Sequence, residues 1–141
     1  MSQSDEVYSI DANIILRYVV GDDPKFFSKA YDILQGVAAG KTTVICDPVN
    51  LAEVVWVLRS FYKLSNEQIC EGLEPVLNME GFLIPDKERY LMALRLFAGG
   101  MKSFGDACAC ASALQDCDGR IFSFDEKLSN IPGITRSESL D

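Results

Sequence analysis

The chain of 141 residues contains no histidine. It therefore cannot use a Ser–His–Asp or Cys–His arrangement for catalysis, and it cannot hold zinc through imidazole nitrogen. No apolar run approaches the roughly 20 residues needed to cross a bilayer. Residues 1–6 lack both the basic region and the apolar stretch of a signal peptide. We therefore expect a cytoplasmic protein with no membrane segment, in which residues 1–6 form a flexible tail.

The cysteines are odd in number and include no C-x-x-C pair. A disulfide framework or a zinc site of thiolates is therefore not indicated. In a reducing compartment such residues usually act as small buried hydrophobes, which is the role we expect here. They are Cys46, Cys70, Cys108, Cys110 and Cys117.

Basic side chains are scarce, since 13 Lys and Arg residues face 21 Asp and Glu residues for a net charge of −8. Phosphate affinity normally comes from Lys and Arg, so the charge argues against a broad surface that coats DNA. Clustered carboxylates that hold cations would contribute to this negative total, and bound cations would reverse the sign locally. The acidic balance also suits a basic protein partner.

Apolar, β-branched segments alternate with segments that carry helix-start signals. An Asp–Pro pair opens two of the helical segments, and a Ser-x-x-Gln capping box opens another. This alternation predicts one α/β domain over residues 1–141, with a parallel sheet and helices on both of its faces. The expected strands are 7–10, 42–46, 81–84, 120–124 and a last one near 134; the expected helices are 12–20, 24–39, 48–62, 65–78, 87–98 and 104–117.

Four acids lie at wide intervals along the chain: Asp11, Glu53, Asp106 and Asp125. Three of them stand at predicted helix starts, where each has an ordinary alternative role as a cap. Asp11 and Asp125 also follow strands, and ligands of parallel sheets bind beyond the carboxyl ends of strands. Four carboxylates in a chain without imidazole are suited to a hard divalent cation such as Mg²⁺ or Mn²⁺.

Glu53 lies within an apolar helical segment, residues 49–58. Arg59 marks the solvent-exposed face of this helix. At about 100° per residue, Glu53 projects about 120° away from Arg59, so we expect it to lie outside that exposed face. A buried, unpaired carboxylate is costly and should find a cation or become protonated. The alternative is that Asn50 and Ser60 continue a polar stripe and leave Glu53 simply exposed.

Four segments carry a family resemblance. They are residues 9–16 (SIDANIIL), 51–58 (LAEVVWVL), 104–107 (FGDA) and 122–125 (FSFD). With these motifs in this order, the chain resembles the PIN-domain ribonucleases, and among them the VapC-type toxins of toxin–antitoxin pairs. The resemblance implies a PIN-like three-layer α/β/α fold with a central, mostly parallel sheet of about five strands.

The resemblance also implies roles for particular residues. Asp11, Glu53, Asp106 and Asp125 would form the acidic set that binds Mg²⁺ or Mn²⁺ and catalyses cleavage. Asn13 matches a polar position that supports the first aspartate, and Ser123 stands where the family usually has threonine. Both would hydrogen-bond to the residues that bind the metal.

The activity implied is that of a metal-dependent endoribonuclease, which leaves 5′-phosphate and 3′-hydroxyl ends. The implied partners are an RNA substrate, an antitoxin protein and a second copy of the chain in a homodimer. Four basic residues near the motifs are candidates for phosphate contact or, alternatively, solvated surface charges: Arg17, Arg59, Lys102 and Lys127.

Two other functions fit the same residues. A noncatalytic protein-interaction scaffold would keep the fold and a metal without turnover. An aspartate-based phosphatase or receiver domain would use a nucleophilic aspartate, but a dehalogenase-type phosphatase needs a second aspartate at position 13, which is Asn13 here.

Overall fold

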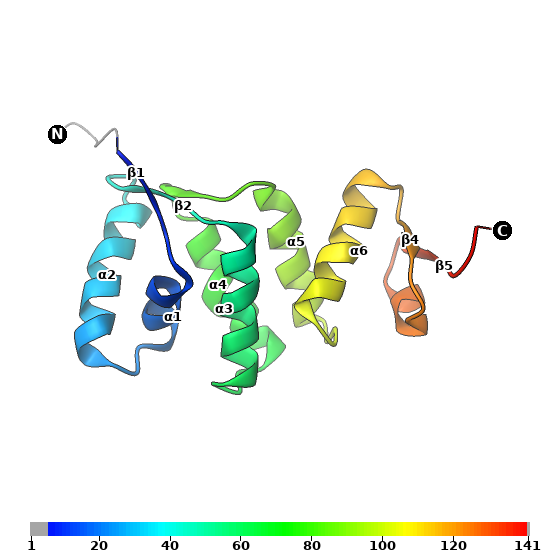
Figure 1. Cartoon of the computed structure of the whole chain (residues 1–141), viewed down its shortest axis with the longest axis horizontal. Coiled ribbons are helices and arrows are strands. Elements are labelled where there is room, and N and C mark those ends of the chain that lie inside the picture. The colour runs from blue at the N-terminus through cyan, green and yellow to red at the C-terminus, as the bar shows by residue number, and fades with distance from the viewer. Residues whose placement is uncertain (1–5, 141) are drawn as a thin grey trace.

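The computed structural model describes residues 6–140, so residues 1–5 of the expected tail lie outside the described part of the chain. Six α-helices, one 3₁₀ helix and five short strands alternate along residues 6–140 (Figure 1). The elements are β1 (Val7–Ser9), α1 (Ala12–Val20), α2 (Pro24–Ala38), β2 (Thr43–Ile45), α3 (Pro48–Ser60), α4 (Asn66–Leu77), β3 (Phe82–Leu83), α5 (Lys87–Ala98), α6 (Phe104–Asp116), β4 (Arg120–Phe122), η1 (Glu126–Asn130) and β5 (Thr135–Ser137).

Local capping interactions explain where most of the helices begin. Asp23 and Asp47 each accept hydrogen bonds from backbone N–H groups of the first turn and are followed by proline, whose fixed φ suits the first helical position. Ser65 and Gln68 form both halves of a capping box at the start of α4. The sequence signals for these three helices are confirmed.

Asp86 directly precedes α5, a position from which an aspartate side chain commonly caps a helix, but it does not cap α5. Asp86 adopts a left-handed backbone with φ 57°, and its side chain makes no capping hydrogen bond to α5. A capping side chain requires an extended backbone at that position, so the preceding turn decides the geometry here. The carboxylate instead lies 3.7 Å from the Arg89 guanidinium.

The five strands form two separate parallel sheets. The first has the order β1-β2-β3, and the second pairs β4 with β5. The α/β class and the parallel pairing are therefore confirmed. The sheet itself is smaller than the five-stranded sheet we expected, because β4 and β5 do not join β1 within one chain.

Only one face of the first sheet is covered by helices. Val44 and Phe82 are buried on that face, whereas Ile45 and Leu83 on the opposite face are 44% and 45% exposed. Within residues 6–140, no second layer of helices covers the opposite face of this sheet, contrary to the three-layer arrangement we expected. The core lies under the covered face and between the helices, with its largest aliphatic side chains fully buried: Leu34, Leu51, Leu58, Leu73 and Leu94.

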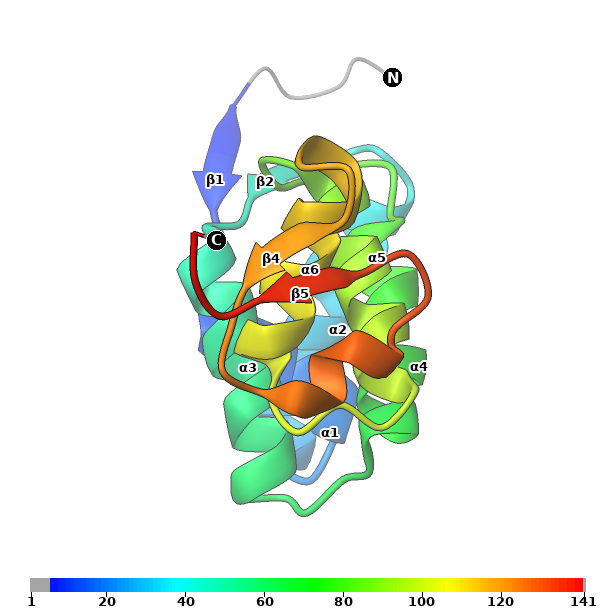
Figure 2. The ribbon, with the colours of Figure 1, turned by 90° about the vertical axis from the view of Figure 1, so that its right-hand side faces the viewer.

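The molecule consists of two regions joined by residues 99–103. The N-terminal region, residues 6–98, contains β1 to α5, and the C-terminal region, residues 104–140, contains α6 to β5. The C-terminal region packs through α6 on α5 and to a smaller extent on α3. Figure 1 shows β4 and β5 at one end of the molecule, on the side of α6 away from α3 and well apart from β1, and Figure 2 shows that end facing the viewer.

No helix between residues 6 and 140 combines the length and the apolar character needed to cross a membrane.

Candidate functional site

Asp11 stands at the carboxyl end of β1 and caps α1. Its Oδ1 accepts a hydrogen bond from the Asn13 backbone N–H at 2.8 Å, and the side chain is exposed. The predicted contact between these two residues is therefore made by the main chain of Asn13. The second carboxylate oxygen of Asp11 has no partner among the described residues, so it is available to a ligand.

Glu53 is exposed on α3, so the expectation that its helix face is dry is wrong. Trp56, on the same side of α3, is 67% exposed, and Val49 and Ala52 are exposed as well. This side is open because none of the elements described in residues 6–140 covers it, which helical spacing alone does not reveal. Within residues 6–140 the carboxylate of Glu53 makes no hydrogen bond or ion pair.

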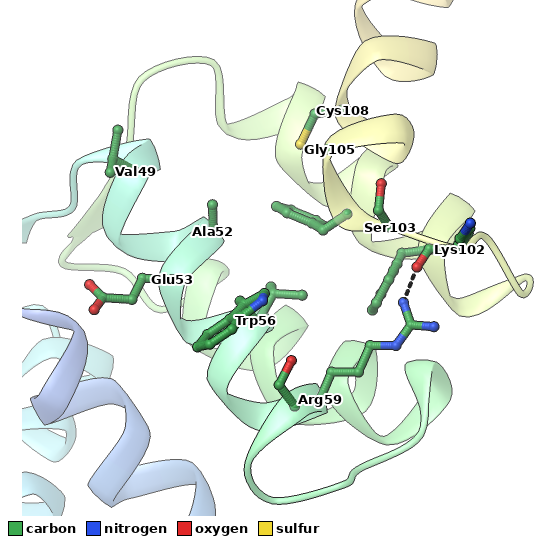
Figure 3. A pocket seen from close by; sticks show the side chains of 13 residues that line it. Val49, Ala52, Glu53, Trp56, Arg59, Lys102, Ser103, Gly105 and Cys108 are labelled. Carbon is green, nitrogen blue, oxygen red and sulfur yellow. Dashed lines mark hydrogen bonds between the residues drawn. The ribbon is translucent and has the colours of Figure 1, made fainter. Parts of the chain in front are cut away.

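A groove of about 860 Å³ lies between α3 and the start of α6, and we call it the α3–α6 groove. Glu53 and Trp56 line its α3 side, and Lys102 and Ser103 line the other. The Arg59 guanidinium closes the far end, where it donates to the Lys102 carbonyl and lies 5.4 Å from the centre of the Phe97 ring. Figure 3 shows that the Glu53 carboxylate points away from α6.

A second groove, of about 630 Å³, lies between the end of α5 and η1, and we call it the α5–η1 groove. Asp106 and Asp125 both line it, together with Lys102 and Lys127. Burial raises the pKa of the nearby Cys110 thiol, and the charges of Asp106 and Asp125 raise it further. The structure therefore brings these two acids to the same place.

Hydrogen bonds fix the backbone of both residues. The Ser103 hydroxyl accepts from the Asp106 N–H at 3.1 Å, and the Ser123 hydroxyl accepts from the Asp125 N–H at 3.0 Å. Oδ1 of Asp125 accepts from the Lys127 N–H, while the Asp106 carboxylate has no partner among the described residues. The Ser123 hydroxyl thus orients Asp125 by bonding to the main-chain N–H of Asp125.

The four predicted site acids are divided between the two regions. Asp106 and Asp125 share the α5–η1 groove, Glu53 lies on the α3–α6 groove, and Asp11 lines neither. Across residues 6–140, no three Asp, Glu or Cys side chains are placed to hold a metal ion together. The expected convergence of all four acids is therefore absent from a single copy of the chain.

Lys102 and Trp56 gain a place in the site from the structure. Lys102 lines both grooves, because it lies in the segment that connects α5 to α6. Trp56 follows Glu53 by three positions, a spacing that places two side chains on the same side of a helix. The sequence contains this spacing, but the exposure of Trp56 becomes evident only in the structure.

Residues 8–134 match the PIN domain family. The chain belongs to the PIN domain family. The match includes all four acids and spans both regions of the molecule. PIN domains are a family of nucleases that typically use divalent metal ions, which favours a hydrolase over a phospho-accepting receiver. No curated protein matches the chain.

The donor chemistry of the four acids suits a divalent metal ion. Magnesium and manganese prefer carboxylate oxygen, and each of the four side chains keeps at least one oxygen without a protein partner within residues 6–140. In the described part of the chain, however, the four carboxylates do not lie close enough together to form one group. The residues fit the ion in their chemistry, but within residues 6–140 only Asp106 and Asp125 share a groove.

Proposed function

We propose that this PIN domain is a metal-dependent endoribonuclease whose site is made by Asp11, Glu53, Asp106 and Asp125. The supporting observation is that the PIN match contains all four residues and that none of them is paired with Lys or Arg. Other acids of the chain are neutralised within it. Examples are Asp22 beside Arg17, Asp116 beside Arg89 and Glu138 beside Arg136.

Unpaired carboxylates leave a negative potential that attracts cations. When bound, Mg²⁺ or Mn²⁺ lowers the pKa of water and neutralises the charge of the scissile phosphate. Asp11 and Asp106 would hold the ion directly, and Glu53 and Asp125 would hold it directly or through water. With no histidine in the chain, a carboxylate is the side chain available to orient and deprotonate the attacking water.

Basic side chains at the grooves would bind the RNA backbone. Lys102 lines both grooves, Lys127 lines the α5–η1 groove, and Arg59 lies at the end of the α3–α6 groove. Arg17 is placed differently, 3.9 Å from both Asp22 and Asp23 and over the Phe26 ring. We therefore assign phosphate contacts to the first three residues and a structural role to Arg17.

The biological role we propose is that of the toxin in a VapBC-type pair. The proposal rests on the resemblance of residues 9–16, 51–58, 104–107 and 122–125 to such toxins. An antitoxin segment that covers the acids would suppress cleavage. The net charge of −8 favours a basic segment for this purpose.

A noncatalytic scaffold is the second candidate, because the acids of one chain are not gathered into a single group. Such a protein would keep the PIN fold and bind partners without cleaving RNA.

Cleavage of total RNA in the presence of Mn²⁺ or Mg²⁺ tests the nuclease directly. We expect fragments with 5′-phosphate ends, none in EDTA, and a loss of more than about a hundredfold in rate for Asp11→Asn. Asp32→Asn is the matched control, because Asp32 is an exposed aspartate on α2, far along the chain from the motifs. If the wild type and Asp11→Asn are equally inert while Mn²⁺ still binds, the scaffold is correct.

Growth after induced expression separates a toxin from a processing enzyme. We expect the wild-type protein to arrest growth and Asp11→Asn to leave growth unchanged. If the purified protein cleaves RNA but its expression leaves growth unaffected, the toxin assignment is wrong and the nuclease assignment stands.

A further inference from the structure

We propose that two copies of this chain exchange their C-terminal regions, so that β4 of one copy pairs with β1 of the other. Each composite site would then contain Asp11 and Glu53 of one chain and Asp106 and Asp125 of the second. The inference rests on the proposed function for the role of these acids. The proposed strand pairing is argued independently of that function, from the free edges of the two sheets.

The outer edge of β1 is free among the described residues, because β1 pairs with β2 alone. The Ile10 N–H donates to the Ile45 carbonyl, so Ile10 directs its peptide groups toward β2. Peptide groups alternate in direction along a strand, and those of Val7 and Ser9 therefore point to the free side. This edge is ready to accept one more parallel strand.

The outer edge of β4 is free in the same sense, because β4 pairs with β5 alone within residues 6–140. The Ser123 N–H donates to Ser137, and the Gly119 carbonyl accepts from Thr135. The peptide groups of Arg120 and Phe122 therefore point away from β5. Phe122 and Phe124 are 68% and 83% exposed, which is unusual for two large apolar side chains so close together.

The direction of these peptide groups restricts how the two edges can pair. In a parallel pair, a residue bonds to the two neighbours of the residue opposite it. Ser9 must therefore lie opposite an odd-numbered residue of β4 or its continuation. Placing Ser9 opposite Ser123 brings Asp11 opposite Asp125, on strands about 4.8 Å apart. Both acids then lie at the carboxyl end of one continuous sheet, where ligands of parallel sheets bind.

The same register covers the bare face of the first sheet. Residues opposite each other in a parallel pair point to the same face, so Ile121 joins the face that carries Ser9, Ile45 and Leu83. Ile121 is partly buried against the core, and β4 packs on α6. The α6 helix of the second copy would therefore lie over Ile45 and Leu83, whose exposure is otherwise unexplained. The sheet would have five strands in the order β3-β2-β1-β4-β5.

Contacts at the junction favour a second copy over closure within one chain. Phe97 and Phe104 pack edge to face with ring centres 5.9 Å apart, and Arg89 pairs with Asp116 at the far end of α6. The Asn66 side chain donates to the carbonyls of Phe97 and Met101 at 2.9 and 2.8 Å. Because β4 lies on the side of α6 away from β1 (Figure 1), joining β4 to its own β1 would require α6 to leave its place on α5. Reciprocal exchange between two copies leaves the packing intact and closes the assembly as a symmetric dimer.

Mixing two inactive variants tests whether the site is shared. Asp11→Asn and Asp125→Asn would each be inactive alone, but a mixed dimer has one intact site of its two. Co-refolding equal amounts should restore about a quarter of the wild-type RNA cleavage in Mn²⁺, because half of the dimers are mixed. Asp11→Asn mixed with Glu53→Gln is the matched control and should restore none, since both acids lie in the same region. No recovery in either mixture would overturn the shared site.

Cross-linking tests the strand pairing without reference to activity. Ser9→Cys in one tagged chain and Ser123→Cys in a second, both with the exposed Cys117 replaced by serine, should give a disulfide-linked pair that contains both tags. Opposite residues of neighbouring strands lie within the range of Cα distances that a disulfide spans. Ser9→Cys alone is the control. In a chain with both substitutions, an internal disulfide with no covalent dimer would show closure within one chain and overturn the proposal.

The two experiments separate the failure of the exchange from the failure of the proposed function. If the wild type cleaves no RNA but the mixed-tag cross-link forms, the exchange stands and the nuclease does not. If the wild type cleaves RNA, runs as a 15.6 kDa monomer and forms no cross-link, the nuclease stands and the exchange is wrong.

Discussion

The N-terminal and C-terminal regions differ in how completely each buries its own apolar side chains. In the N-terminal region, helices cover one face of the sheet and the core leucines are fully buried. In the C-terminal region, Phe122 at the end of β4 and Phe124 just after that strand are exposed, and Leu128 is the buried residue of η1. The region that carries Asp106 and Asp125 thus depends most on what it docks against. The proposed site, which draws acids from both regions, would share that dependence.

The largest effect is expected at the contact between the regions. Phe97 is fully buried on α5 and packs against Phe104 of α6. Phe97→Ala should lower the free energy of unfolding by about 3–5 kcal/mol, because it removes a large ring and leaves a cavity. Urea denaturation followed by circular dichroism measures this.

Phe122→Ala is the control for that substitution. In dilute solution, where single chains prevail, it should change the free energy of unfolding by less than about 0.5 kcal/mol, because the ring is already exposed. Equal effects of the two substitutions would mean that the regions do not differ in the way described.

A smaller effect is expected from the polar contact that holds the junction. Asn66→Ala removes both hydrogen bonds to the carbonyls of Phe97 and Met101 and should cost about 1–3 kcal/mol. The exposed Asn78 offers a control, and Asn78→Ala should cost clearly less. Thermal unfolding compares the two variants, and equal melting temperatures would contradict the role of Asn66.

Helix caps in the two regions should respond differently to the same substitution. Ser65→Ala removes part of the capping box of α4 and should lower the free energy of unfolding by about 1 kcal/mol. Ser103→Ala removes the cap of α6 and should mainly increase amide hydrogen exchange in the first turn of that helix. Exchange that increases across the whole molecule after Ser103→Ala would show that the C-terminal region is not a separate unit.

The smallest effect concerns thiol reactivity. Burial raises the pKa of the Cys46 thiol to about 11, and burial raises that of Cys108 to about 11 as well. At pH 8 only about one in a thousand of these thiols is ionised, so they should react slowly with iodoacetamide. Cys117 is exposed and should react first. Mass spectrometry of the labelled protein checks the order, and early labelling of Cys46 would contradict it.

Local sequence signals predicted the elements well. Asp23–Pro24, Asp47–Pro48 and the Ser65–Gln68 capping box set helix starts through contacts within one turn, and each is present in the structure. Asp86 is the exception, since its backbone is set by the preceding turn.

The arrangement of the elements could not be predicted in the same way. Helical spacing placed Glu53 away from Arg59, but whether that side is dry depends on which element covers it. Whether Asp11 meets Asp125, as we propose, likewise depends on which strand pairs with the outer edge of β4. Both depend on contacts between residues far apart in the sequence. The sequence of β4 is the same whether its outer edge pairs with a strand of its own chain or of a second chain.

Binding of Mn²⁺ followed by electron paramagnetic resonance tests most directly whether acids from both regions act as one site. We predict that Asp11→Asn and Asp125→Asn each weaken binding at the same site by more than about tenfold, while Asp32→Asn binds as the wild type does. If Asp125→Asn loses the bound Mn²⁺ and Asp11→Asn keeps it unchanged, the two regions do not share a metal site.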